Sequence, residues 1–227
     1  MTMATHDSTP ASGEFFEAYI SEQEPIERNI AMHKKYLFLL AVLSSLIAPL
    51  SSAQVPVFKV TQEQSSVKFY VKASVALAGD FKKWDASLTF TSTDVTSGHL
   101  DINIQAASVD SGSGMKDDKL KSNDFFDVSA NPLITFKSTS FIQTGPTTIS
   151  VPGTFTIRGV SKPETLTLIV NGAGTGSGDI KGTMAFDRKE YGMNSGIPFI
   201  KIADRVEVTV DLFGKRVSGP PVVLKKF

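Results

Sequence analysis

The sequence of 227 residues contains no cysteine, which excludes disulfides, thiolate catalysis and cysteine-based zinc sites. This absence leaves export open, because many periplasmic proteins have no disulfide. A surplus of charge is also lacking, since 23 basic residues stand against 23 acidic ones. A chain without a basic surplus has no electrostatic footprint for nucleic acid. With 20% charged and 41% hydrophobic residues, the composition is typical of one globular domain, with or without extra segments.

One apolar run stands out, Tyr36–Leu43, within the stretch Met32–Gln54. Two lysines precede the run and Ser51-Ser52-Ala53 follows it, which is the layout of a secretory signal peptide. The run is shorter than the roughly 20 residues that a membrane span needs. Cleavage before Gln54 is therefore preferred over a buried helix or a membrane anchor, and the absence of cysteine excludes a lipid-anchored lipoprotein. We expect a periplasmic or secreted protein.

The organisation predicted from this signal has three parts: residues 1–31, residues 32–53 as the signal peptide, and residues 54–227 as one β-barrel domain. Two explanations of the acidic first part stay open, an upstream start with Met32 as the true one, or a genuine extension. Loss of residues 1–53 removes three basic and six acidic residues, which leaves 20 and 17, a net charge of +3. That charge is still too small and scattered for nucleic-acid binding.

Histidine is scarce after residue 53, where His99 is the only one. A single histidine at a strand start predicts a surface residue rather than a transition-metal site. A Ser–His–Asp arrangement would have to include His99, and no Gly-x-Ser-x-Gly elbow accompanies it. Asp117-Asp118 is interpreted as part of a solvated helix face with local ion pairs, and Asp187–Glu190 as a strand-end salt-bridge network. We therefore expect neither a catalytic nor a metal site.

Most of the chain after residue 54 alternates between apolar and polar residues, which predicts strands with one buried and one wet face. About eight antiparallel strands predict an all-β fold, either a sandwich or an extended barrel, and the barrel is favoured because closure removes exposed edges. The glycine-rich stretch Asn171–Gly178 lacks the Lys-Ser/Thr pair of a nucleotide loop and predicts a hairpin. The alternating stretches are SVKFYVKA, ASLTFTS, HLDINIQA, LITFKSTSF, ISVPGTFTI, TLTLIV, IKGTMAFD and RVEVTVDLF.

One connection, Ser113–Val128, predicts a short helix in this all-β chain, placed across an open barrel end. Within it, Phe125 and Phe126 stand between acids in an otherwise polar segment. Two such rings suit a helical turn over an apolar barrel, which they would plug or gate. Gly153 and Gly182 lie on apolar strand faces and are interpreted as relief of curvature or bulges, with open interior volume as the alternative.

Several motifs together resemble the YceI-like family of small periplasmic or secreted proteins. They are "GDFKKWDASLTF", "LKSNDFFDVSANPLITFKSTS", "IRGVSKP" and "FDRKEYGM", within a resemblance that covers Val57–Phe213. The resemblance implies a lipocalin-like antiparallel barrel whose long apolar pocket takes a polyisoprenoid, such as a quinone tail. The family's Phe-Phe pair falls on Phe125 and Phe126. Two stretches, "VKASVALAG" and "NSGIPFIKIADR", depart from the family pattern, so the resemblance assigns no head-group specificity.

The favoured function is an exported binder or carrier of a long isoprenoid lipid, since every strand offers an apolar face and catalytic groups are lacking. The lipid, membrane donor or acceptor proteins and a second copy of the chain are the expected partners, and no cofactor is expected. The alternative for each candidate contact is plain core packing. The candidates are Val67, Phe69, Val71, Leu88, Phe90, Ile102, Phe125, Phe126, Phe136, Phe155 and Met184.

A second function from another class is a stress-related interaction module, whose barrel is filled with side chains and whose surface acts. Its exposed patch would be Lys82-Lys83-Trp84. Trp84, however, matches an aromatic inside the family pattern, so we expect it to be buried. The stretch "PPVVLKKF" at the end of the sequence is apolar enough to dock on a partner.

Overall fold

Strands make up most of the computed structural model, which describes residues 54–74, 77–196 and 201–227. One α-helix, α2 (Gly114–Lys121), and three short 3-10 turns, η1 (Val95–Ser97), η2 (Ala106–Ser108) and η3 (Arg188–Tyr191), complete the described part. The strands are β1 (Val57–Ala73), β2 (Leu77–Phe81), β3 (Trp84–Phe90), β4 (Gly98–Gln105), β5 (Val109–Asp110), β6 (Leu133–Ser138), β7 (Ile142–Gln143), β8 (Thr148–Ile157), β9 (Val160–Asn171), β10 (Ser177–Asp187) and β11 (Ile202–Ser218). The predicted signal peptide lies outside the described residues.

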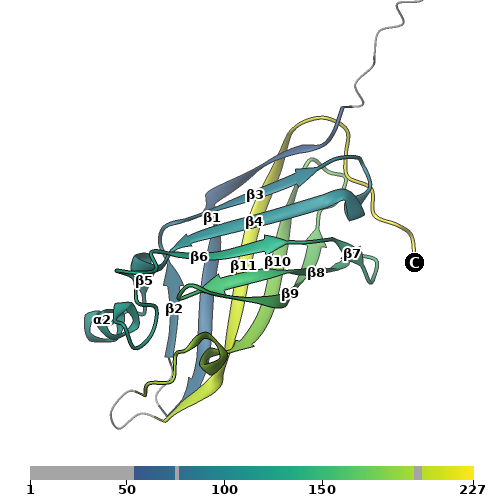
Figure 1. Cartoon of the computed structure of the whole chain (residues 1–227). Helices are drawn as coiled ribbons and strands as arrows, with labels where there is room; N and C mark the ends of the chain where they lie inside the picture. The colour runs from purple at the N-terminus through teal and green to yellow at the C-terminus, as the bar shows by residue number, and fades with distance from the viewer. Residues whose placement is uncertain (1–53, 75–76, 197–200) are drawn as a thin grey trace, which may run out of the picture. The chain divides into compact units, whose positions relative to one another are not determined.

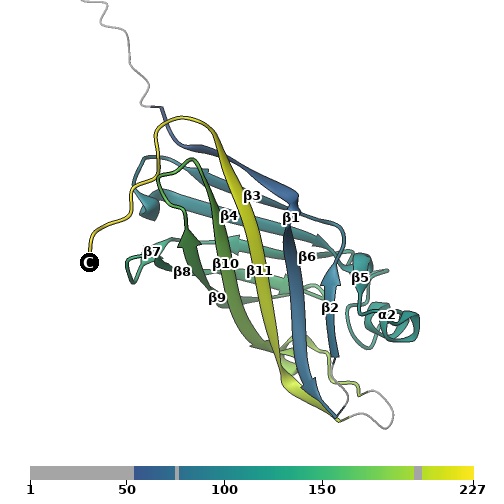
Figure 2. The ribbon, with the colours of Figure 1, turned by 180° about the vertical axis from the view of Figure 1, so that it is seen from behind.

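Eight of these strands close into an antiparallel barrel in the order β1-β3-β4-β6-β8-β9-β10-β11, with β11 returning to β1. The closing β1–β11 pair runs from Val57 opposite Ser218 to Ala73 opposite Ile202. Figures 1 and 2 show the two long strands side by side along the wall. β2 and β5 extend the sheet beside β1, and β7 pairs with β8. The predicted eight-stranded barrel is confirmed.

The barrel forms because apolar residues recur at every second position of its strands. In β1, Val67, Phe69 and Val71 are buried, while Lys68 and Tyr70 are exposed. The inward side chains of all eight strands meet in one hydrophobic core. Closure leaves the core accessible only through the two ends of the barrel, so the residues at the ends decide what enters.

Two hairpins mark these ends. The β8–β9 turn places Arg158 and Gly159 at φ of 54° and 72°, the positive values that a two-residue hairpin requires. The glycine-rich stretch Asn171–Gly178 joins β9 to β10 at the opposite end, as a hairpin, which confirms that prediction. α2 lies at the end that carries the β8–β9 turn (Figure 1).

None of the helices within the described ranges combines the length and the hydropathy that crossing a bilayer takes.

The helical connection is shorter than predicted. α2 stops at Lys121, and the chain then forms tight turns rather than a second helical turn. Ser122 terminates the helix, because its Oγ donates to the carbonyl of Lys119 and thus competes with the helical pattern. Asp127 adopts a positive φ of 51°, which turns the chain back toward β6.

Candidate ligand-binding cavities

An apolar cavity of about 60 Å3 lies at the barrel end that carries α2, and we call it the helix-end cavity. Six of the predicted contact residues line it: Val67, Phe69, Val71, Phe125, Phe126 and Phe155. The rest of the lining was not predicted as a site, although the alternation had placed much of it on buried faces. It consists of Leu77, Phe81, Ile104, Leu120, Ile134, Ile157, Phe186, Arg188, Met193, Ile202, Val206 and Val208.

Phe125 and Phe126 are both buried, with 4% and 7% of their surface exposed. The Phe126 ring lies 6.5 Å from Phe69, almost perpendicular to it, and 5.9 Å from Phe81. Its backbone amide donates to the carbonyl of Leu120 at 2.9 Å, which ties the turn to the last part of α2. The two rings therefore belong to the wall of the cavity, as the sequence predicted for a segment that closes a barrel end.

Polar contacts hold this closing segment in place. Arg158, from the β8–β9 turn, donates to the carbonyl of Asn123 at 2.8 Å. Asp124 pairs with Lys119 and accepts a hydrogen bond from Ser195 Oγ at 3.0 Å. These donors, Lys119 first, hold the pKa of Asp124 below its usual value. The segment with the two phenylalanines is thus fastened to the loop after η3 as well as to the β8–β9 turn.

Arg188 is the one charged side chain in the lining of the helix-end cavity, and it is 6% exposed. Its guanidinium donates to the carbonyls of Met193, Ser195 (2.9 Å) and Ala203 (3.2 Å), and to Asp204 Oδ1 at 3.2 Å. These bonds use four of the five N–H donors, and the Asp204 carboxylate compensates the charge within the wall. Arg188 consequently joins η3 to β11 and leaves the cavity apolar. Sequence reasoning had interpreted Asp187–Glu190 as an ion-pair cluster, which agrees with this role.

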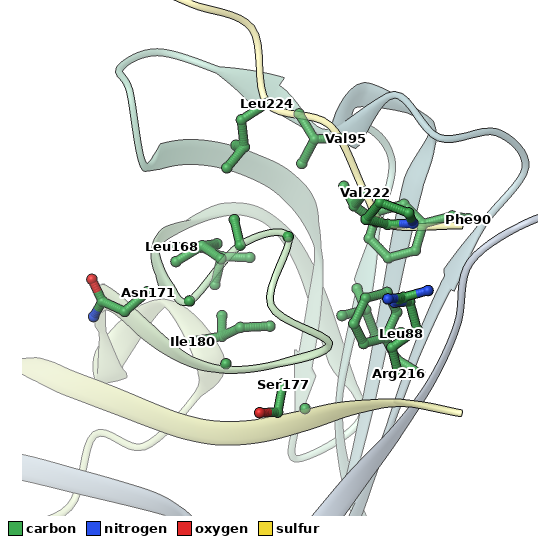
Figure 3. Close-up of a pocket in the computed structure, with 18 of the residues that line it drawn as sticks. Leu88, Phe90, Val95, Leu168, Asn171, Ser177, Ile180, Arg216, Val222 and Leu224 are labelled. Carbon is green, nitrogen blue, oxygen red and sulfur yellow. The ribbon is translucent and has the colours of Figure 1, made fainter. Parts of the chain in front are cut away.

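The opposite end of the barrel contains a second apolar cavity of about 70 Å3, which we call the mouth cavity. Two predicted contact residues, Leu88 and Phe90, line it. The glycine-rich β9–β10 loop forms one side. Figure 3 shows the labelled side chains of Val95, Leu168, Ile180, Val222 and Leu224 around the space. The remaining lining residues are Phe58, Phe141, Ile149, Val170, Asn171, Gly172, Ala173, Gly174, Gly176, Ser177, Gly178, Gly214, Arg216 and Pro221.

Residues Gly219–Phe227, which we call the strap, follow β11 at this end of the barrel (Figure 1). Three of them, Pro221, Val222 and Leu224, line the mouth cavity. Val222 and Leu224 are half-buried against the core, whereas Val223 and Lys225 between and after them face outward. The stretch "PPVVLKKF" was predicted to be an exposed docking segment. The structure corrects this in part, because two of its apolar residues cover the mouth cavity. The sequence carries no signal for this role, because Val222, Val223 and Leu224 are all apolar although only Val222 and Leu224 face the core.

The two cavities are separated by a layer of buried side chains. On β10, Ile180 lines the mouth cavity, Phe186 lines the helix-end cavity, and Met184 lies between them. Ile102 and Phe136, which are register partners on β4 and β6, also line neither cavity and are buried. These three predicted contact residues form the middle layer. Among the described residues, the barrel interior thus contains an apolar cavity at each end, with the middle layer between them.

The glycines on apolar faces are explained by close packing. A Cβ at Gly153 would lie 2.6 Å from the Phe136 ring, and one at Gly182 would lie 3.1 Å from Leu168. Neither glycine interrupts the register of its strand, so they do not mark bulges. Their space is filled by neighbouring side chains, which also excludes open volume over these two positions.

The side chains of His99 and Ser138 meet at the edge of β4. His99 Nδ1 lies 3.3 Å from Ser138 Oγ, and His99 Nε2 lies 3.5 Å from Asp101. Ser138 is 4% exposed, and its Oγ accepts from the backbone amide of Leu100 at 2.8 Å. This hydroxyl therefore completes the ladder between β4 and β6. The His99 side chain is half exposed, as the sequence predicted. Within the described ranges, no three His, Asp or Glu side chains gather as metal ligands do.

The barrel and its motifs match a known family model, that of the YceI-like domain, over residues 58–213. The chain belongs to the YceI-like domain family. It is 32% identical to a UPF0312 protein of Pseudomonas aeruginosa over 63% of this chain and 76% of that protein. A UPF0312 protein of Azotobacter vinelandii is 34% identical over 38% of this chain, and the match spans only 45% of that relative.

Solved structures with the YceI-like barrel superpose on the chain. BcnA of Burkholderia cenocepacia has a TM-score of 0.62 and 26% identity, covering 68% of this chain and 99% of BcnA. A polyisoprenoid binding domain from Saccharophagus degradans has a TM-score of 0.55 and 14% identity, covering 71% of this chain and 99% of that domain. At 14% identity the second likeness shows the fold alone.

Proposed function

We propose that the protein binds a long apolar isoprenoid lipid, of the quinone or polyprenyl type, inside the barrel and carries it. The observation that carries this proposal is the pair of apolar cavities at opposite ends of one closed barrel, in line along its strands. The Saccharophagus degradans domain, whose fold this chain shares, is described as polyisoprenoid-binding. A slender chain without polar groups suits the interior of an eight-stranded barrel, which is wide enough for one such ligand.

The chemistry of the interior favours an apolar chain over a polar ligand. Among the described residues that line the helix-end cavity, the sole charge, on Arg188, is already paired within the wall. Burial of apolar surface contributes about 25 cal/mol per Å2. Each isoprene unit would then add roughly 3 kcal/mol at most, before the loss of chain entropy is subtracted. Affinity should thus rise with the length of the lipid.

A lipid that spans both cavities has to displace the middle layer of Ile102, Phe136 and Met184. Methionine adapts to this because its unbranched side chain has several rotatable bonds. We propose that these side chains move aside when the chain threads the barrel and refill the space when it leaves. The middle layer would thereby keep the empty barrel packed, which a permanently open tunnel does not allow.

The interaction module, the alternative function, required an exposed Trp84 and a filled barrel. Trp84 is 8% exposed, and both ends of the barrel contain cavities. Lys82 and Lys83 are exposed, but they lack the aromatic partner that the patch would need. The lipid-binding proposal therefore has the stronger support.

The decisive test is extraction of bound lipid. The protein is purified under native conditions from its own cell envelope, extracted with organic solvent and analysed by mass spectrometry. We expect an isoprenoid lipid in the extract. The stripped protein is then titrated with farnesol, geranylgeraniol and solanesol, and binding should tighten along this series. Repeated native preparations without lipid, combined with no binding of any of the three, would overturn the proposal.

A matched pair of variants tests the path through the middle layer. Met184→Trp adds volume between the cavities, whereas Thr183→Trp places the same indole side chain on the outer face of the same strand. We expect Met184→Trp alone to weaken solanesol binding more than farnesol binding. Equal effects of the two variants would place the lipid elsewhere. Thermal melts establish that both variants are folded.

We also propose that the protein acts after export, with the signal peptide removed before Gln54. The basic, apolar and small-residue segments of Met32–Ala53 support this. Amino-terminal sequencing of the exported protein should begin at Gln54. Recovery of residues before Gln54 on the exported form would contradict the proposal.

A further inference from the structure

Exposed apolar side chains gather around the mouth of the barrel. Nine large hydrophobic residues are exposed among those that the structure describes, and six of them lie on elements that border the mouth. β1 begins and β11 ends there, because Val57 stands opposite Ser218. We call these six residues the rim. They are Val57, Ile142, Ile169, Val217, Val223 and Phe227.

Basic side chains are interleaved with the rim. Five Lys or Arg residues lie at the start of β1, at the end of β11 and in the strap. Asp94 and Asp179 are the acidic residues on the loop before η1 and at the start of β10, so positive charge prevails at this end. The basic residues are Lys59, Lys215, Arg216, Lys225 and Lys226.

The strap connects this surface to the cavity behind it. Val223 and Phe227 are 56% and 71% exposed, while Val222 and Leu224 on the other side of the strap line the mouth cavity. Any surface that binds the outer face of the strap is therefore separated from the cavity by a single layer of chain. The strap and Val217 lie beyond residues 58–213, the part that matches the family model.

We propose that the rim docks the barrel, mouth first, on an anionic lipid bilayer. The rim places apolar side chains around the barrel end with cations between them. This arrangement matches a bilayer surface, whose head groups are negatively charged and whose interior is apolar. A protein partner would instead need one continuous apolar groove or patch. The docking itself does not depend on the proposed function. The further step, in which lipid enters the mouth cavity from the bilayer, does rest on it.

Sedimentation with vesicles tests the docking. The purified protein is mixed with vesicles of phosphatidylglycerol and phosphatidylcholine, or of phosphatidylcholine alone, all free of isoprenoids. We expect the protein to pellet with the anionic vesicles and to be released by salt. The variant with Lys225→Gln and Lys226→Gln should bind about 25-fold more weakly, because each cation contributes about fivefold near such a surface. The variant with Val223→Ser and Phe227→Ser should also lose binding.

The control variant carries Met115→Ser and Lys83→Gln, an exposed apolar residue and a cation outside the rim, on α2 and on the β2–β3 turn. Its vesicle binding should equal that of the unchanged protein, and any contribution of residues before Gln54 is common to all variants. Absence of vesicle binding, or an equal loss in the control and in the rim variants, overturns the docking. Vesicle binding that persists while all isoprenols fail to bind would refute the proposed function and leave the docking intact.

Discussion

Two aromatic residues in a polar connection, Phe125 and Phe126, carry more information than any acid or histidine of the sequence. Their neighbours are charged or small, so a solvent-exposed connection has no use for them. In the structure Phe126 contacts Phe69 of β1 and Phe81 of β2, which explains how one turn closes a barrel end. The sequence predicted the burial of the rings, but their partners depend on how distant strands meet.

Phe126→Ala should destabilise the protein by about 3 kcal/mol, because it removes a buried ring between two others. Chemical denaturation measures the change, and Met115→Ala, at a residue that is 86% exposed, should leave the unfolding midpoint unchanged. If Phe126→Ala retains the normal amount of lipid, the ring only closes the barrel end and does not contribute to lipid binding. If Phe126→Ala lowered the free energy of unfolding no more than an ordinary surface substitution does, the packing described above would be contradicted.

Acid should destabilise the fold through Asp204, whose pKa is lowered first by its hydrogen bond from Lys189 and further by Arg188. A carboxyl with a lowered pKa in the folded state stabilises that state above its unfolded pKa, and the contribution disappears as the pH falls through the folded value. The melting temperature should thus fall below about pH 4. The melting temperature of Asp204→Asn should be lower at neutral pH and should change less when the pH falls. The control variant Asp118→Asn, on α2, should behave like the unchanged protein. Identical pH profiles of Asp204→Asn and the unchanged protein would refute this.

At the level of elements, strict alternation was sufficient to identify the eight strands of the barrel. It failed where the alternation is broken: the sequence indicated β1 only from Ser66, whereas the strand begins at Val57. A register shift between Thr61 and Ser66 interrupts the pattern at that point. The two-residue strands β5 and β7 have no periodicity to detect, so only their partners define them.

Beyond Gly219, hydrogen bonds attach the strap at two of its residues. Val223 donates to Thr93 (2.7 Å) and accepts from Val95 (3.2 Å), and Lys225 donates to and accepts from the Gln143 side chain (2.8 and 3.0 Å). Its apolar contacts should therefore decide whether the mouth stays covered. Serine at both Val222 and Leu224 should expose the mouth cavity, seen as increased Nile red fluorescence and faster hydrogen exchange of the strap.

The matched control for the strap is Val223→Ser, which changes the same kind of residue on the outward face. It should leave dye binding and exchange unchanged. If the outward substitution loosened the strap as much as the inward pair, the cover would depend on the backbone bonds and not on Val222 and Leu224.

For the whole molecule, the sequence predicted a closed barrel with an apolar interior but not how that interior is divided. Alternation shows which side chains point inward, and it does not reveal how completely side chains from eight strands fill the space. Predicted contacts accordingly separated into three groups, at the helix end, at the mouth and in the middle layer. Val222 and Leu224 were missed because their burial follows from a chain reversal after β11 and not from any periodic strand.

Met184→Ala tests this division, because it removes part of the layer between the cavities. The empty protein should lose about 2–4 kcal/mol of stability, as for other large-to-small changes in a core. A long isoprenoid no longer has to displace that side chain, so solanesol should raise the melting temperature of Met184→Ala more than that of the unchanged protein. Thr183→Ala, on the outer face of β10, should show neither effect. Destabilisation of Met184→Ala without this additional gain from solanesol would mean that the lipid does not pass through the middle of the barrel.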